Sequence, residues 1–201
     1  MSTSLVYRTA AGYELVMRAL YGRHYSDRLR AVAAEVPYGS SVLELCCGPG
    51  TLYTRFLRAR VSSYVGLDIN ERFVYLLRRQ GVDARVADLA GSNEPLPPAD
   101  VALIQASLYL FLPRAEPIVD RMLAAASDRV VVSEPIRNLA SSANPLIRTL
   151  GRRAADPGAG GGGRRFTEDT LDALVDRYRE LVIESRLIPG GREKLYVLRA
   201  G

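Results

Sequence analysis

The stretch VLELCCGPGTLY, Val42 to Tyr53, decides how this 201-residue sequence folds. An apolar run ends in an acidic residue and two adjacent cysteines, then Gly48-Pro49-Gly50 follows, and a helical pattern begins near Gly50. A buried strand, a glycine turn and a helix in this order are typical of the first unit of a doubly wound sheet. Because glycine has no Cβ atom, the backbone of such a turn can approach a bound nucleotide-like cofactor closely.

Strand-like and helix-like patterns alternate along the rest of the chain. Two helical patterns precede the turn, one near residues 11–21 and one from Ser26, whose hydroxyl can cap it. Later helices are expected after Asn70, over the apolar residues 119–126, and from Thr167. Strands separated by helices predict a parallel sheet covered on both faces. The further strands expected in this series are residues 63–69, 84–89, 101–106 and 129–135.

The end of the chain departs from this alternation. Two strand-like runs, residues 180–188 and 194–200, are separated by a connection too short for a helical crossover, so they must be antiparallel neighbours. The predicted fold class is therefore α/β: a Rossmann-like doubly wound sheet of seven strands, mostly parallel with an antiparallel C-terminal hairpin strand, and helices on both faces. We expect an N-terminal helical cap, residues 1–40, and a cofactor-binding domain, residues 41–201.

Composition and charge narrow the classes of function. The net charge is +5, but the arginines are scattered and Lys194 is the only lysine, so a nucleic-acid partner is disfavoured. No apolar run approaches the roughly 20 residues of a membrane span, and the first residues lack the pattern of a secretory signal, so we expect a cytoplasmic protein. The single histidine gives no metal-ligand spacing, so no metal is expected. Cys46 and Cys47 are predicted to be reduced, buried thiols.

Two cofactors fit a turn of this kind. The fingerprint of a nicotinamide dinucleotide asks for a third glycine, and counted from Gly48 that position holds Tyr53, which argues against a tightly bound pyrophosphate. S-adenosylmethionine has no phosphate and needs no such position. About 20 residues after the turn, Asp68 ends the second strand, where a carboxylate can accept hydrogen bonds from both hydroxyls of a ribose.

The segment Glu44 to Gly50 resembles the first motif of the class I S-adenosylmethionine-dependent methyltransferases. The resemblance extends over residues 41–201 and implies that the glycines border the amino acid part of the cofactor, that Asp68 holds the ribose and that Asp88 contacts the adenine. One departure is Cys46, which stands where the family often has its first glycine and implies a slightly crowded pocket. The cofactor-binding residues that the resemblance predicts are Glu44, Cys46, Gly48, Gly50, Asp68, Ile69, Asp88, Leu89 and Gln105.

The acceptor site is expected under the N-terminal helices, which cap the site in family members of this size. Methyl transfer is an in-line displacement in which the cofactor brings its own leaving group, so alignment of acceptor and methyl group supplies most of the acceleration. A base is needed only where the acceptor carries a proton. We predict His24 and Tyr109 as catalytic residues, with helix-surface and packing roles as their alternatives. The predicted substrate contacts are Tyr13, Tyr21 and Arg137.

These residues predict a methyltransferase that acts on oxygen or nitrogen of a small-molecule acceptor and returns S-adenosylhomocysteine. Residues 105–108 read Gln-Ala-Ser-Leu, without the Pro-Pro-aromatic run of enzymes that methylate nucleobase amines. The alternatives are a methyltransferase for RNA, protein or phospholipid, whose arginine-bearing N-terminal helices could contact a membrane surface; a non-catalytic cofactor-binding module; and an NAD(P)-dependent oxidoreductase. The glycine-rich residues 156–165 are predicted to form a surface loop, with an edge of the substrate entrance as the alternative.

Overall fold

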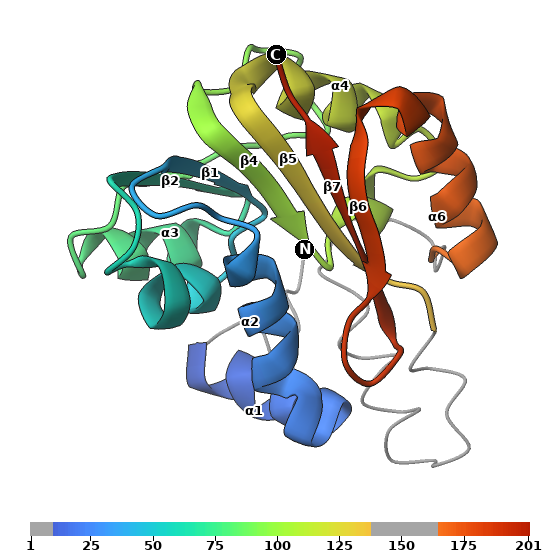
Figure 1. Ribbon diagram of the computed structural model, residues 1–201. Helices are drawn as coiled ribbons and strands as arrows, with labels where there is room; N and C mark the ends of the chain where they lie inside the picture. Colours follow the sequence, from blue (N-terminus) through green and yellow to red (C-terminus); the bar gives the residue numbers. More distant parts are fainter. Residues whose placement is uncertain (1–9, 138–164) are drawn as a thin grey trace.

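The computed structural model describes residues 10–137 and 165–201, in which seven strands form one sheet (Figure 1). The strand order is β3-β2-β1-β4-β5-β7-β6. Strands β1 to β5 run parallel, whereas β7 is antiparallel to both β5 and β6. The predicted fold class is confirmed. The strands are β1 (Ser41–Leu45), β2 (Ser63–Asp68), β3 (Ala84–Val86), β4 (Ala99–Gln105), β5 (Ala126–Pro135), β6 (Val182–Leu187) and β7 (Glu193–Arg199).

Helices cover both faces of the sheet because successive strand side chains point to opposite sides. On β1, Val42 belongs to the core beneath one set of helices, while Leu43 belongs to the core on the other face. The first core is covered by α1 (Ala10–Tyr21), α2 (Tyr25–Ala34) and α3 (Glu71–Arg78), and the second by α4 (Glu116–Ala125) and α6 (Glu168–Val175). Helix α2 and the sheet share one core. The predicted division into a helical cap, residues 1–40, and a cofactor-binding domain, residues 41–201, therefore stays a prediction. Short 3₁₀ turns are η2 (Gly22–His24), η4 (Leu108–Phe111) and η6 (Asp176–Leu181).

The helix starts show where local signals were sufficient. The Asn70 side chain accepts hydrogen bonds from the amides of Arg72 and Phe73, as a predicted N-cap should. Thr167 begins α6 through a reciprocal capping box with Thr170. The predicted cap at Ser26 is wrong. The turn η2 continues directly into α2, and the first amide of α2 already donates a hydrogen bond to a carbonyl group of this turn.

The helix after the glycine turn is not a regular α-helix. Residues Tyr53–Leu57 form a π-helix, η3, in which the Arg58 amide donates to the Tyr53 carbonyl at 2.9 Å. The Tyr53 ring stacks on the Tyr64 ring of β2 with centroids 4.0 Å apart. A single π-turn inside a helix is rare and is often found at functional sites.

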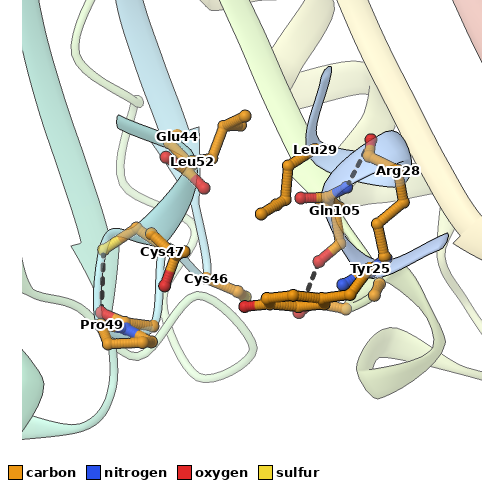
Figure 2. Close-up of a pocket in the computed structure, with 13 residues that line it drawn as sticks. Tyr25, Arg28, Leu29, Glu44, Cys46, Cys47, Pro49, Leu52 and Gln105 are labelled. Atoms are coloured by element: carbon orange, nitrogen blue, oxygen red, sulfur yellow. Dashed lines mark hydrogen bonds between the residues drawn. The ribbon is translucent and has the colours of Figure 1, made fainter. Parts of the chain in front are cut away.

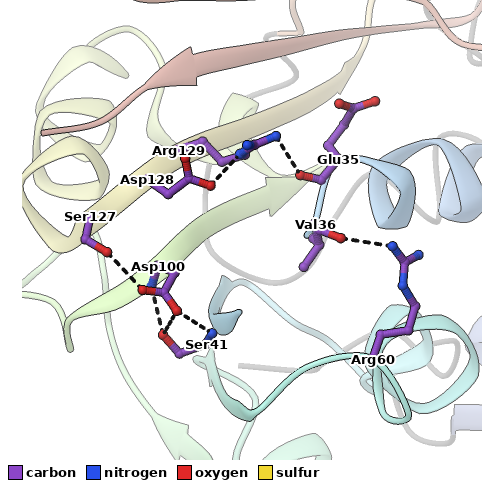
Figure 3. A network of polar contacts seen from close by, with 8 residues as sticks. All are labelled: Glu35, Val36, Ser41, Arg60, Asp100, Ser127, Asp128 and Arg129. Atoms are coloured by element: carbon purple, nitrogen blue, oxygen red, sulfur yellow. Dashed lines mark hydrogen bonds and ion pairs between the residues drawn. The ribbon is translucent and has the colours of Figure 1, made fainter. Parts of the chain in front are cut away.

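A polar network ties the amino ends of three strands together (Figure 3). Asp100 of β4 accepts hydrogen bonds from the Ser41 amide at 2.7 Å, the Ser41 hydroxyl at 2.8 Å and the Ser127 hydroxyl at 3.0 Å. These donors hold the pKa of Asp100 below its ordinary value, the Ser41 amide contributing most. The network lies at the opposite end of the strands from the glycine turn, so its role is structural.

The end of α2 is bound to the same edge of the sheet. Arg129 of β5 donates to the Glu35 carbonyl at 3.4 Å, and Arg60 donates to the Val36 carbonyl at 2.9 Å (Figure 3). Two cationic side chains therefore satisfy carbonyl groups that the helix end leaves without an intrahelical partner. This anchors the cap helix at one end and fixes its direction across the sheet.

Replacing Gly50 with alanine is expected to destabilise the fold more than the same change at Gly81. Both glycines have a positive φ, +68° and +75°, which costs a non-glycine residue about 1 kcal/mol or more. A Cβ atom on Gly50 would also lie 2.5 Å from the buried Leu77 side chain, whereas one on Gly81 would meet nothing within 4 Å. Urea unfolding should show an additional loss of about 1–3 kcal/mol for Gly50→Ala. Equal losses would contradict the tight contact of the turn with α3.

Candidate functional site

A cleft opens where the order of the parallel strands reverses, between the carboxyl ends of β1 and β4. Open α/β sheets bind their ligands at such a switch point. The glycine turn forms one wall and α2 forms the opposite wall, with the Tyr25 ring lying between them (Figure 2). The residues that line the cleft are Tyr25, Arg28 and Leu29 of α2; Glu44, Cys46, Cys47, Gly48, Pro49, Thr51 and Leu52 of β1 and its turn; and Gln105, Ala106 and Ser107 at the end of β4.

Backbone strain is concentrated in this cleft. Among the described residues, Cys46 and Ala106 are the non-glycine residues with a positive φ, 54° and 53°. Such a conformation costs about 1–3 kcal/mol and is typically found at active sites and ligand clamps. The left-handed backbone at Cys46 also explains in physical terms why glycine suits this position in the family that the motif resembles.

Asp68, at the end of β2, holds the glycine turn in place. One carboxylate oxygen accepts a hydrogen bond from the Gly48 amide at 2.7 Å, and the other accepts one from the Asn70 amide at 2.8 Å. Burial raises the pKa of Asp68, and these two amides oppose the rise. Each oxygen keeps a second lone pair for a ribose hydroxyl. The next residue, Ile69, is 58% exposed and presents an apolar surface beside it.

Among the residues that line the cleft, Glu44 is the one that carries a carboxyl group. Its side chain accepts a hydrogen bond from the Tyr64 hydroxyl at 2.8 Å. Burial raises the pKa of Glu44 to about 8, the hydrogen bond from Tyr64 lowers it, and the nearby Asp68 raises it further. Within the described ranges no ion pair involves Glu44.

The other predicted cofactor residues lie at the same edge of the sheet in different settings. Gln105 lines the cleft, and its amide donates to the Arg28 carbonyl at 3.3 Å (Figure 2). Asp88 follows β3 and is exposed, with one oxygen accepting from the amides of the turn after it. Leu89 is buried in the second core. Gly50 lies behind the turn against Leu77.

The two predicted catalytic residues are not brought together. His24 lies 3.4 Å from the Asp27 carboxylate, and a Cβ on Gly190 of the β6–β7 turn would meet its ring at 3.1 Å. Tyr109 lies in η4, where the Arg165 guanidinium is centred 3.2 Å from its ring, and burial raises the pKa of this phenol. Neither side chain is part of the cleft lining.

The predicted substrate contacts are also dispersed. Tyr21 is buried, with the Arg28 guanidinium 4.3 Å from its ring centroid. Arg137 is exposed at the end of the first described range. Tyr13 belongs to α1, but its side chain is outside the described part of the structure, as are residues 156–164 of the glycine-rich stretch.

A buried ion pair that the sequence did not indicate joins α2 to β7. Arg28 donates to Glu193 at 2.7 Å, and the Ser133 hydroxyl donates to the other oxygen of Glu193 at 3.2 Å. The side chains of Arg28 and Glu193 are only 5% and 2% exposed. The partners are 165 residues apart, so no local pattern could have paired them.

Glu134, at the end of β5, is a second buried polar residue that sequence reasoning missed, and it lies outside the cleft lining. One oxygen accepts from the Leu108 amide at 2.8 Å, and the other is buried without a hydrogen-bond partner in the described structure. Burial raises the pKa of Glu134 to about 8, and the charge of Glu193 adds to this. An acidic residue two positions after the apolar run 130–132 was a signal that could have found it.

Comparisons with known proteins agree with this geometry. No family model matches the chain. Over 90 residues, 44% of this chain, the sequence is 41% identical to a trans-aconitate 2-methyltransferase of Mycolicibacterium gilvum. The matched segment spans about a third, 34%, of that relative.

Solved structures share the fold over nearly the whole chain. A methyltransferase of Thermotoga maritima, described as a possible histamine N-methyltransferase, is 15% identical with a TM-score of 0.66 and 98% of each chain covered. Magnesium protoporphyrin IX methyltransferase of Synechocystis with bound S-adenosylhomocysteine is 16% identical with a TM-score of 0.62 and 97% of each chain covered. The resemblance to the class I S-adenosylmethionine-dependent methyltransferases is thus confirmed, in fold along the chain and in sequence over the 90 residues.

In residues 10–137 and 165–201, no three or more His, Cys, Asp or Glu side chains are arranged to hold a metal ion. The helices of the same ranges are all too short or too polar to cross a membrane.

The Arg28–Glu193 pair is expected to contribute strongly to stability. Glu193→Gln would leave the Arg28 charge buried without its carboxylate, so the free energy of unfolding should fall by about 3 kcal/mol. The matched control is Asp83→Asn, which removes an ion pair with Arg85 in which both side chains are 49% exposed and should cost less than about 1 kcal/mol. Urea unfolding of both variants measures the difference. Similar small losses would show that the buried pair does not anchor α2.

Proposed function

We propose that this chain is an S-adenosylmethionine-dependent methyltransferase that acts on an oxygen or nitrogen atom of a small-molecule acceptor. The observation that carries the proposal is the glycine turn at the switch point, held by the Asp68 carboxylate at the end of the neighbouring strand. The partial sequence match to trans-aconitate 2-methyltransferase supports a small acceptor. The products would be the methylated acceptor and S-adenosylhomocysteine.

The residues of the cleft fit a cofactor that carries positive charge and no phosphate. Glu44 offers a carboxyl group without an ion-pair partner in the described structure, and Pro49 has no amide hydrogen to give to a phosphate. The one cation of the lining, Arg28, is bound to Glu193. Tyr53, at the position of the third dinucleotide glycine, is stacked on Tyr64. An NAD(P)-dependent oxidoreductase is therefore less well supported.

In this mechanism the cofactor supplies the methyl group and the leaving group, and the chain supplies binding and alignment. Asp68 would hold the ribose, Asp88 the adenine amino group, and the turn with Glu44 the amino acid part. Tyr25 and Leu29 of α2 line the wall opposite the turn, where they would contact the bound cofactor or acceptor.

Glu134 lies outside the cleft lining but at the same end of the sheet, and we propose it as the group that receives a proton from an acceptor that carries one. It lies at the end of β5, beside the end of β4, and its unpartnered oxygen can accept a hydrogen bond. With a pKa of about 8 this carboxyl is mostly protonated at pH 7, so it would act as a general base through its ionised fraction, which grows as the pH approaches 8. His24, predicted from its residue type, contacts the β6–β7 turn instead.

The alternatives receive less support from the surface. Arg18 pairs with Glu14, and Arg30 pairs with Asp27, so part of the positive charge of the N-terminal helices is already compensated. This weakens the case for an RNA or phospholipid substrate bound by a basic patch. A non-catalytic module with the same cofactor cleft differs from the proposed enzyme only in turnover.

Calorimetric titration with S-adenosylhomocysteine, beside NAD, tests the cofactor assignment. We expect binding of the former alone, and a loss of roughly a hundredfold or more in Asp68→Ala, because two hydrogen bonds to a charged group contribute about 1.5–3 kcal/mol each. Asp88→Ala removes one such bond and should lose nearer tenfold. Thermal melting checks that both variants fold. Equal and negligible losses would place the cofactor elsewhere.

Methyl transfer from labelled S-adenosylmethionine tests the activity. Suitable first acceptors are trans-aconitate, histamine and magnesium protoporphyrin IX, which present carboxylates, an amine and a flat macrocycle, followed by a wider small-molecule library. Label on a small molecule supports the proposal, and the acceptor that takes it identifies the atom. Label transferred only to RNA, protein or phospholipid would overturn the small-molecule assignment. Cofactor binding without turnover on any acceptor would favour the binding module.

A further inference from the structure

The carboxyl group of Glu44 is enclosed in the proposed cofactor cleft without a compensating charge. The residue is 4% exposed, and its hydrogen bond from the Tyr64 hydroxyl is a neutral one. No arginine, lysine or histidine of the described residues lies within ion-pair distance of it. A buried carboxylate in this setting loses its hydration and gains little in return.

The groups that face Glu44 reinforce this imbalance. From β2, Tyr64 donates the hydrogen bond and Asp68 adds a negative charge. In the turn, burial raises the thiol pKa values of Cys46 and Cys47, so both thiols stay neutral.

The opposite walls do not supply the missing positive charge. On α2, Tyr25 is a buried phenol whose pKa is raised, and the Arg28 guanidinium is held by Glu193. Gln105 of β4 is neutral and bound to the Arg28 carbonyl. Among the described residues, then, none supplies the positive charge that would stabilise an ionised Glu44, whereas a bound cationic ligand would supply it.

We infer that Glu44 is protonated in the free protein at neutral pH and ionises when a cationic cofactor enters the cleft, so that cofactor binding releases a proton from this side chain. The inference rests on the proposed function, because S-adenosylmethionine carries both a sulfonium and an ammonium group. Glu44 would thereby act as a specificity-determining residue that favours positively charged ligands over neutral or anionic ones.

The direction of the pH dependence follows from the two states of the carboxyl group. In the free protein burial raises the pKa of Glu44 to about 8, so most of the molecules are protonated at pH 7. A ligand cation a few ångströms away lowers that pKa. Affinity should rise by up to about tenfold per pH unit between the bound and free pKa values, and the rise should end near pH 8, where Glu44 is ionised in the free protein and the cofactor's ammonium begins to lose its proton.

Calorimetric titration of the full chain with S-adenosylmethionine, between pH 6 and 9 in buffers of different ionisation enthalpy, counts the released protons. Wild-type protein should release close to one more proton at pH 7 than Glu44→Gln. The cofactor's own ammonium also titrates, and Glu44 shifts its pKa, so the two proteins are compared at pH 7 and below, where the ammonium is largely protonated. Equal proton release by the two proteins would overturn the inference.

Two further variants extend this test: one should shift the pH dependence of affinity in a known direction, and the other is a control. Tyr64→Phe removes the hydrogen bond that favours the ionised carboxyl, so the pH at which the rise in affinity ends should move upward. Glu168→Gln changes a carboxyl that binds Lys194 at the start of α6, and it should behave as wild type. A downward or absent shift in folded Tyr64→Phe would count against the inference.

Carbon-13 NMR of the glutamate carboxyls in the free protein separates this inference from the proposed function. The resonance missing in Glu44→Gln and displaced in Tyr64→Phe should titrate near pH 8, and a midpoint near the ordinary value of about 4.3 would overturn the inference whatever the ligand. A midpoint near 8 without binding of S-adenosylmethionine would instead refute the cofactor and leave a site for another cation.

Discussion

The hydrogen bond from the Gly48 amide to Asp68 is the constraint on which the cofactor cleft depends. It joins the turn after β1 to the end of β2, so two neighbouring strands present their carboxyl ends at a fixed separation. The left-handed backbone of Cys46, just before this contact, is held in place by it and by the bond from the Cys47 amide to the Leu67 carbonyl. Strain of this kind persists only where surrounding contacts over-determine the conformation.

Buried carboxyl groups are concentrated at this end of the strands. Glu44, Asp68, Glu134 and Glu193 are all buried, and Arg28 forms an ion pair with Glu193. The opposite end has the reverse character, because the hydrogen bonds to Asp100 are complete and lower its pKa. Fully satisfied polar groups stabilise a fold, whereas incompletely satisfied ones are typical of sites that await a ligand. The amino ends of the strands thus contribute mainly to stability, and the carboxyl ends form the candidate binding site.

The sheet and most of its helices could be predicted because their signals are local. Apolar runs of strand length, separated by helical periodicity and by a short hairpin connection, define the order of elements without knowledge of distant contacts. The caps at Asn70 and Thr167 are equally local. The cofactor side of the site was accessible for the same reason, since Glu44 and Gly48 lie within one short motif.

The long-range contacts around the cleft could not be predicted in this way. The Arg28–Glu193 contact and the enclosure of Glu134 arise from elements that are far apart in the chain. His24 was selected by residue type, although its position against the β6–β7 turn depends on how α2 crosses the sheet. The π-turn at Tyr53 was missed because it follows from a ring stack with another strand.

That ring stack has a consequence for the evolution of the cofactor site. Tyr53 stands where a dinucleotide-binding turn has its third glycine, yet its ring supports Tyr64, whose hydroxyl reaches Glu44. A change of Tyr53 to glycine would remove the support of the ring that contacts the cleft carboxyl before it created a pyrophosphate site. Tyr53, Tyr64 and Glu44 therefore depend on one another, although they lie on a helix and two different strands. If this cleft evolved into a dinucleotide site by single substitutions, the intermediate proteins would bind neither ligand well.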